Sequence, residues 1–108
     1  MVLDHEVAMA RVGSDTELLR ELAQLFLEES PRLMGELRAA HEQGDAKQVE
    51  QAAHGLKGSV ANFGAKPAVD AAHQIELLGK AGKLEAVAEV LRSLDLALLA
   101  LHAELTQL

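Results

Sequence analysis

The sequence predicts an all-α fold, an antiparallel up-down-up-down four-helix bundle with a short extra N-terminal helix. Apolar residues recur at three- and four-residue steps along most of the chain, and no segment alternates apolar and polar residues with period two. The breaks between the helical segments are short, which forces neighbouring helices to run antiparallel. At 108 residues we expect one helical bundle domain, residues 1–108, around one hydrophobic core.

The first long helix is expected to begin at Ser14-Asp15-Thr16-Glu17, a capping-box pattern with Ser14 at the N-cap, and to end at Gly44-Asp45. Pro31 lies inside this segment. Because proline lacks an amide hydrogen and crowds the preceding turn, we expect either a kink or two abutting helices there. The predicted buried stripe of this segment consists of Leu18, Leu22, Leu25, Leu33, Leu37 and Ala40.

Three further helices follow. The second is expected from about Ala46 to Phe63, with Gly64 as a left-handed C-cap, and the third from Pro67 to a stop near Gly79–Gly82. The fourth is expected from Lys83 onward. Their predicted buried seams are Val49, Ala53, Leu56, Val60 and Phe63, then Ala68, Ala71, Ile75 and Leu78, then Leu84, Val87, Leu91, Leu94, Leu98, Leu101, Leu105 and Leu108.

Two leucines, Leu96 and Leu99, lie off the last seam. We expect the N-terminal stretch Val2 to Val12 to form the short extra helix and to cover them. A contact between two copies of the chain is the alternative use of these leucines.

Composition excludes several classes of function. The formal net charge of −7 disfavours binding to a phosphate backbone, and only two phenylalanines are present for base stacking, so nucleic acid is not an expected partner. The chain has no cysteine, which excludes disulfides and thiolate zinc sites. No apolar run reaches the length of about 20 residues that a membrane-spanning helix needs, and no leader-like segment opens the chain. We therefore expect a cytoplasmic protein without a membrane partner.

His54 is the histidine that the helical pattern directs toward water. At 100° per residue it lies about 140° from the centre of the seam of its helix. Gln51 precedes it by one turn, and Lys57 and Gly58 follow by one turn. Because glycine costs about 1 kcal/mol relative to alanine inside a helix, Gly58 needs a compensating role, such as letting another protein approach the imidazole.

An exposed imidazole has a pKa of about 6.5, so at pH 7 it is largely neutral and its free nitrogen can attack phosphorus. Lys57 can place an ammonium near the phosphoryl oxygens. The chain has no phosphate-binding loop of the Walker type and no evident magnesium-binding carboxylate cluster, so both the phosphoryl group and any metal are expected to come from a partner. A metal- or cofactor-binding bundle that uses His54 and His73 is an alternative, but only one half of the required carboxylate-x-x-histidine pair is present, at Asp70–His73.

The run His54-Gly55-Leu56-Lys57-Gly58-Ser59, followed by Gly64-Ala65, resembles the H-x-L-K-G-S-x-x-x-x-G-A signature of histidine-containing phosphotransfer (HPt) domains of bacterial multistep two-component phosphorelays. The similarity extends over nearly the whole chain, through Arg11-Val12-Gly13, residues 26–31 and Gly44-Asp45.

The resemblance implies that His54 is phosphorylated, that Lys57 steadies the phosphoryl group, and that Gly58 gives a receiver domain access. Many relatives have a glutamine where this chain has Glu76, whose charge would oppose a phosphoryl group. Lys80, one turn later, matches a basic position in relatives and could compensate. Gln51 is a further auxiliary residue of this face.

We expect a monomer, and the resemblance implies a phosphocarrier without an ATP-binding or kinase site of its own. Its partners would be response-regulator receiver domains and a hybrid sensor histidine kinase. No cofactor is expected on this chain, and Mg²⁺ is expected on the receiver. A helical adaptor that binds receivers without phosphotransfer is the alternative.

Overall fold

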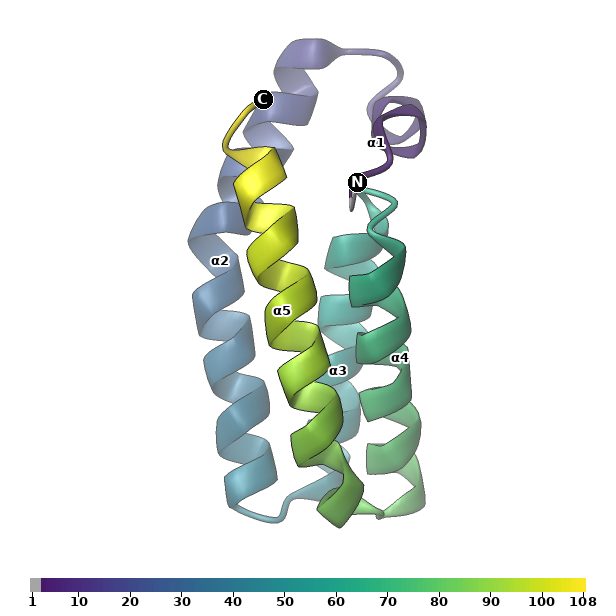
Figure 1. Ribbon diagram of the computed structural model, residues 1–108, viewed down its shortest axis with the longest axis vertical. Coiled ribbons are helices and arrows are strands. Elements are labelled where there is room, and N and C mark those ends of the chain that lie inside the picture. The colour runs from purple at the N-terminus through teal and green to yellow at the C-terminus, as the bar shows by residue number, and fades with distance from the viewer. Residues whose placement is uncertain (1–2) are drawn as a thin grey trace.

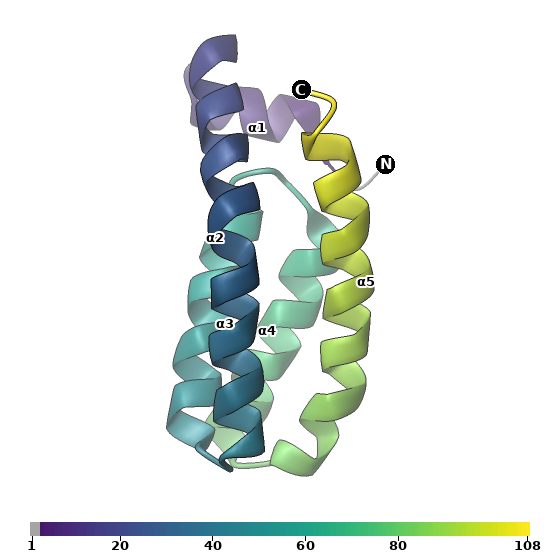
Figure 2. The same cartoon turned by 90° about the vertical axis from the view of Figure 1, so that its left-hand side faces the viewer.

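The computed structural model describes residues 3–108, and its ordered elements over that range are helices, which confirms the predicted all-α class (Figure 1). The four long helices lie side by side along the 41 Å axis of the molecule. Helices α2 and α4 each contact α3 and α5, so α3 and α5 lie diagonally across the core (Figure 2). In chain order the elements are α1 (His5–Arg11), α2 (Thr16–Glu42), α3 (Ala46–Ala61), α4 (Lys66–Ala81), the 3-10 turn η1 (Leu84–Ala86) and α5 (Val87–Leu105).

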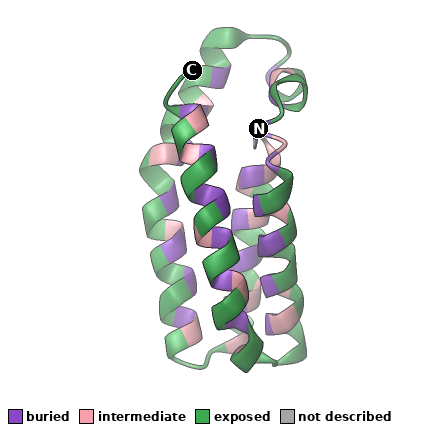
Figure 3. Cartoon of the chain, viewed as in Figure 1, coloured by how far each residue is buried: buried purple, intermediate pink, exposed green. Residues whose placement is uncertain are grey.

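The buried residues follow one side of each long helix (Figure 3), and their side chains form a single core. The seam predicted for α3 is buried from Val49 to Phe63, and the seam predicted for α5 is buried from Val87 to Leu105. In α4 the predicted residues are buried except Leu78, which is half-buried. Each fully buried leucine or valine contributes about 1.5–3 kcal/mol relative to exposure, so these stripes hold the helices together.

The predicted stripe of α2 was wrong in its N-terminal half. Leu18 and Leu25 are exposed, Leu25 to 55%, while the neighbouring Leu19, Ala23 and Phe26 face the core. The apolar arc of α2 is wider than one stripe, and periodicity within a single helix does not choose between adjacent stripes. Packing against the other helices decides which stripe is buried. The Phe26 ring contacts the Phe63 ring, just after α3, edge-on, with the ring centroids 5.5 Å apart.

The start of α2 also differs from the prediction. Asp15, not Ser14, is the N-cap, and its carboxylate accepts a hydrogen bond from the Leu18 amide at 3.1 Å. Ser14 has φ +65°, directly after Gly13 at +62°, so the chain reverses through two left-handed residues before the helix begins. Farther along, α2 continues through Pro31 as one helix, which rules out two abutting helices.

Helix α1 lies across the end of the bundle where α3 turns into α4 (Figure 1). The Asp4 amide donates to the Phe63 carbonyl at 2.9 Å, and a Cβ on Gly64 would lie 2.5 Å from the Asp4 Cβ. Gly64 has the left-handed conformation that was predicted for it, with φ +60°, but it is not the C-cap: α3 ends at Ala61, before the predicted end at Phe63, and its C-cap is Asn62. The α3–α4 turn thus holds the start of α1.

The N-terminal segment therefore does not cover the two leucines assigned to it. Leu96 and Leu99 lie in the middle of α5 and are each 69% exposed, which corrects that prediction. The physical reason is that α1 is attached at the α3–α4 turn, at the end of the bundle, whereas Leu96 and Leu99 lie along the middle of α5. Val2, the first residue of the predicted segment, lies outside the described residues. No helix within residues 3–108 is long and apolar enough to cross a membrane.

Gly79 brings α3 and α4 into close contact. A Cβ at this position would lie 2.7 Å from the Glu50 amide nitrogen and 3.1 Å from the Ala46 carbonyl oxygen, both on the backbone of α3. Helix α4 continues through Gly79 and ends at Ala81, with Gly82 as its left-handed C-cap at φ +72°. Of the range Gly79–Gly82 in which this helix was predicted to end, Gly82 is therefore the residue that ends it, while Gly79 allows α4 to pack closely against α3.

Candidate functional site

His54 lies in the second half of α3 with its ring directed outward, and its side chain is 68% exposed. This exposure confirms the outward direction that the helical pattern predicts. The buried seam of α3 on the opposite side, which includes Ala53 and Leu56, holds the backbone of this turn against the core. His54 is therefore an accessible imidazole on a firmly packed helix.

The side chain of Glu76 on α4 sets the orientation of the His54 ring. Glu76 Oε2 lies 2.9 Å from His54 Nδ1. An ionised carboxylate can only accept hydrogen bonds, so Nδ1 carries the proton and Nε2 has the free lone pair. The nitrogen left for chemistry is the one that points away from the bundle.

Lys57, one turn after His54 on α3, neutralises the charge of Glu76. Its Nζ lies 2.6 Å from Glu76 Oε1, so the two side chains form a close ion pair. The Glu76 side chain is only 17% exposed. Lys57 is the main cause that holds the pKa of Glu76 below its ordinary value, against the opposing effect of burial, with His54 adding to the lowering. Glu76 is therefore a charged acceptor at neutral pH.

His73 joins this group, although the sequence pattern suggested no relay role for it. It lies one turn before Glu76 on α4, and its Nδ1 is 3.5 Å from Lys57 Nζ and 3.7 Å from Glu76 Oε1. The signal in the sequence was the i,i+3 spacing of His73 and Glu76, which places them on one face of a helix. Which helix that face would meet could not be read from the spacing.

Gly58 lies at the centre of the outward face of α3, and a Cβ added there would meet nothing within 4 Å. The same is true of Gly55. At 100° per residue, these glycines lie between His54 and the side of α3 that faces α2. Because neither glycine packs against another side chain or helix within residues 3–108, both leave the approach to His54 open.

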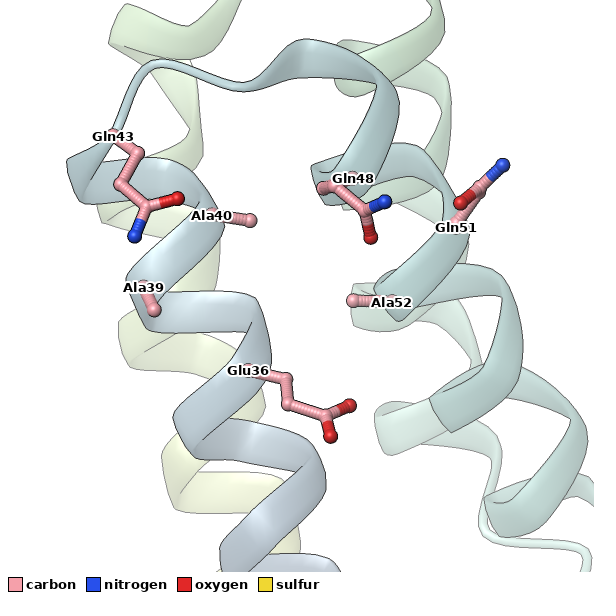
Figure 4. Close-up of a pocket in the computed structure, with 7 residues that line it drawn as sticks. All are labelled: Glu36, Ala39, Ala40, Gln43, Gln48, Gln51 and Ala52. Carbon is pink, nitrogen blue, oxygen red and sulfur yellow. The ribbon is translucent and has the colours of Figure 1, made fainter.

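Two auxiliary residues predicted from the sequence lie apart from the His54–Glu76 contact. Gln51 is exposed on α3 at a shallow polar hollow between α2 and α3, and its amide nitrogen points away from α2 (Figure 4). Lys80 is exposed in the last turn of α4, and no ion pair joins it to Glu76 within residues 3–108. The charge of Glu76 is compensated by Lys57 rather than by Lys80.

The described residues contain no group of three or more His, Cys, Asp and Glu side chains arranged to hold a metal ion. What His54, Glu76 and Lys57 form is an exposed nucleophilic nitrogen, a carboxylate behind its ring and a cation beside that carboxylate. Such an arrangement suits transfer of a group onto and off Nε2, because the carboxylate stabilises the positive charge that the ring gains when Nε2 forms a bond.

Comparisons with known proteins point to the same chemistry. The family model described as Hpt domain matches residues 21–108. The crystal structure of histidine-containing phosphotransfer protein B (HptB) from Pseudomonas aeruginosa PAO1 is similar with a TM-score of 0.91 and 22% identity, over 98% of this chain and 92% of that chain. A search of curated proteins found no match. Because the family model spans most of the sequence, the chain belongs to the Hpt domain family and is a histidine phosphotransfer protein of a phosphorelay.

Proposed function

We propose that His54 carries the phosphoryl group, accepting it from the aspartyl phosphate of one receiver domain and passing it to the aspartate of another. The observation that carries this proposal is the contact between His54 Nδ1 and the Glu76 carboxylate, from which the tautomer of the ring follows. Its Nδ1 is occupied by Glu76 at 2.9 Å, while the exposed Nε2 has no protein partner within residues 3–108.

The transfer is a reversible exchange of one bond to phosphorus. The Nε2 lone pair attacks the phosphorus, the P–O bond to the receiver aspartate breaks, and the aspartate leaves as a carboxylate. The phosphorylated ring carries positive charge, and Glu76 stabilises it through the Nδ1 hydrogen bond. In the second step an aspartate oxygen of the next receiver attacks the phosphorus, and the ring returns to its neutral form.

Lys57 is proposed to steady the phosphoryl oxygens. In the unphosphorylated chain its ammonium lies on Glu76 at 2.6 Å, one turn from His54. The flexible lysine stem lets the ammonium turn from Glu76 toward a new anion nearby without a change in the backbone. The negative charge of Glu76, which the family pattern makes unexpected, then lies behind the ring and away from Nε2.

We propose that the receiver docks over the outward face of α3. The bare backbone at Gly55 and Gly58 allows close approach, and Gln51 is exposed on the same helix one turn before His54. Beyond the glycines an apolar groove of about 160 Å³ separates α2 from α3. The groove is lined by Leu22, Leu25, Phe26, Glu29, Leu33, Ser59, Asn62 and Phe63. A small, mostly apolar patch suits a transient complex that must release its partner.

The remaining features of the proposal concern partners and cofactors. The Hpt family interacts with response-regulator receiver domains and kinases; we propose that the first receiver belongs to a hybrid sensor histidine kinase and that the exchange takes place in the cytoplasm with this chain as a monomer. We further propose a pure phosphocarrier without an ATP-binding site, with Mg²⁺ on the receiver. The Glu76 carboxylate already contacts Lys57 and His54, which supports placing the Mg²⁺ on the receiver and not on this chain.

We also infer that the architecture is an up-down-up-down four-helix bundle with α1 as a short extra helix, and that residues 1–108 form one domain. The short turns that join α2 to α3 and α3 to α4 at opposite ends support the up-down order (Figure 1). The single cluster of buried apolar residues, to which all four long helices contribute, supports one domain.

The test is transfer from a response-regulator receiver domain phosphorylated with labelled acetyl phosphate. We expect acid-labile, base-stable label on this chain, lost in His54→Gln while the helical circular dichroism spectrum is unchanged. His5→Gln, which removes an exposed histidine of α1, serves as the matched control and should retain the label. Label that persists in His54→Gln would overturn the assignment. An adaptor would bind the receiver and take no label.

A further inference from the structure

His73 is the one member of the charged group around Glu76 that the proposed transfer leaves without a role. Its side chain is 52% exposed, so its ring can exchange protons with water. Its Nδ1 lies 3.5 Å from Lys57 Nζ. Since an ammonium can only donate hydrogen bonds, Nδ1 can meet Lys57 in the resting chain only as an acceptor, with its lone pair.

Phosphorylation of His54 changes the charge balance at this point. In the resting chain the charges of Glu76 and Lys57 cancel across 2.6 Å. A phosphoryl group on Nε2 adds about two negative charges that compete for the same ammonium. If Lys57 turns to the phosphoryl group, the Glu76 carboxylate loses its ion-pair partner while it is still only 17% exposed. A half-buried carboxylate whose Oε1 has lost its cation is costly, because only Oε2 keeps a partner, in the His54 ring, and that remaining hydrogen bond would be held less firmly.

The geometry points to His73 as a positioning residue that replaces Lys57 on Glu76 in the phosphorylated state. When Lys57 leaves, His73 Nδ1 takes a proton from water and donates it as a hydrogen bond to Glu76 Oε1, which lies 3.7 Å away in the resting chain. The imidazolium then keeps the carboxylate in place behind the His54 ring. This inference rests on the proposed phosphorylation of His54.

The other charged groups near His73 do not compete for this role. Asp70, one turn earlier on α4, lies within 3.3 Å of Lys66 Nζ in an exposed ion pair. Lys80, on the turn after Glu76, makes no ion pair within the described residues. On α3 the facing groups are Lys57 and His54, both already part of the group. His73 is therefore placed to add one positive charge when the phosphoryl group arrives.

The first test is a titration of His73 followed by ¹⁵N NMR of the histidine rings, before and after phosphorylation with phosphoramidate, with the modified site confirmed by mass spectrometry. We expect the midpoint of His73 to rise by about one pH unit on phosphorylation of His54, as for a histidine that gains an opposite charge nearby. In Glu76→Gln the rise should be clearly smaller, because only the more distant phosphoryl group remains. An unchanged midpoint, or an equal rise in Glu76→Gln, would overturn the proposal.

The second test follows the low-field proton signal of His54 Nδ1–H in the phosphorylated protein. The signal should persist in wild type and in the matched control His5→Gln, and be lost in His73→Gln. His73→Lys, which supplies a permanent cation, should restore it. A signal that persists in phosphorylated His73→Gln contradicts the role given to His73. If phosphoramidate leaves His54 unmodified, the proposed phosphorylation fails first, whereas a modified His54 with no response at His73 refutes this inference alone.

Discussion

Glu76 Oε2 on α4 lies 2.9 Å from His54 Nδ1 on α3, so a carboxylate on one helix selects which nitrogen of a histidine on the next is free. We predict that ¹⁵N shifts show the Nδ1–H tautomer in wild type and a mixture of tautomers in Glu76→Ala. Transfer to Glu76→Ala should be about 10-fold slower or more, since a hydrogen bond to a charged group contributes about 1.5–3 kcal/mol. A wild-type ring protonated at Nε2 would refute the geometry.

We predict that Gly58 lowers the free energy of unfolding and, in exchange, lets the receiver reach His54. Because a Cβ at this position meets nothing, Gly58→Ala should raise the free energy of unfolding by up to about 1 kcal/mol through helix propensity. A larger side chain, in Gly58→Leu, should slow transfer from the receiver. Gly35 on α2 is an equally open helical glycine, so Gly35→Ala should stabilise similarly and Gly35→Leu should leave transfer unchanged. Urea unfolding and transfer kinetics of the four variants check this contrast.

Gly79 should show the opposite effect on stability. Gly79→Ala places a methyl group 2.7 Å from the Glu50 amide nitrogen, a backbone atom that cannot move aside freely. We expect the free energy of unfolding to fall by about 1–3 kcal/mol, the usual cost of overpacking. The separation of α3 and α4 should also weaken the Glu76–His54 contact, so transfer should slow. A stability equal to that of Gly58→Ala would show that α3 and α4 do not need this close approach.

His102 should make stability depend on pH. Burial beside α2 lowers the pKa of His102, and its Nε2 lies 2.8 Å from the hydroxyl oxygen of the buried Ser30. The folded protein thus binds the proton more weakly than the unfolded chain, whose histidine has a pKa of about 6.5. The free energy of unfolding should therefore decrease as the pH falls below that value, with the loss complete below the lowered pKa of the folded state. Urea titrations between pH 8 and 5 should show a smaller decrease in His102→Gln; parallel curves would contradict the assignment.

Leu25 tests the docking surface proposed beside His54. Its side chain is 55% exposed at the groove between α2 and α3, so Leu25→Asp should cost little stability and should weaken receiver docking, measured as a higher KM for transfer. Leu99, exposed on α5 diagonally across the bundle from α3, provides the control: Leu99→Asp should change neither KM nor the sedimentation coefficient of the monomer. Equal effects of both variants would remove the groove from the docking surface.

Much of this protein is determined by local pattern. The seams of α3 and α5 could be read directly, because their apolar residues recur at three- and four-residue steps along the helix, although α5 has two further leucines outside its seam. The outward direction of His54 followed from the same geometry, and the motif around it identified the family. On α2 the pattern failed, because Leu18 and Leu19 belong to adjacent stripes that are both apolar, and only contact with the other helices decides which stripe is buried.

The tertiary structure alone decided what surrounds His54. A helical period sets the direction of a side chain relative to its own helix, but the distance between side chains on two helices depends on how closely the helices approach and in which register. Gly79 sets that approach for α3 and α4, and it brings Glu76 and His73 to Lys57 and His54. The sequence determined an exposed histidine of a phosphotransfer family; packing determined its tautomer, the cation paired with Glu76 and the second histidine beside them.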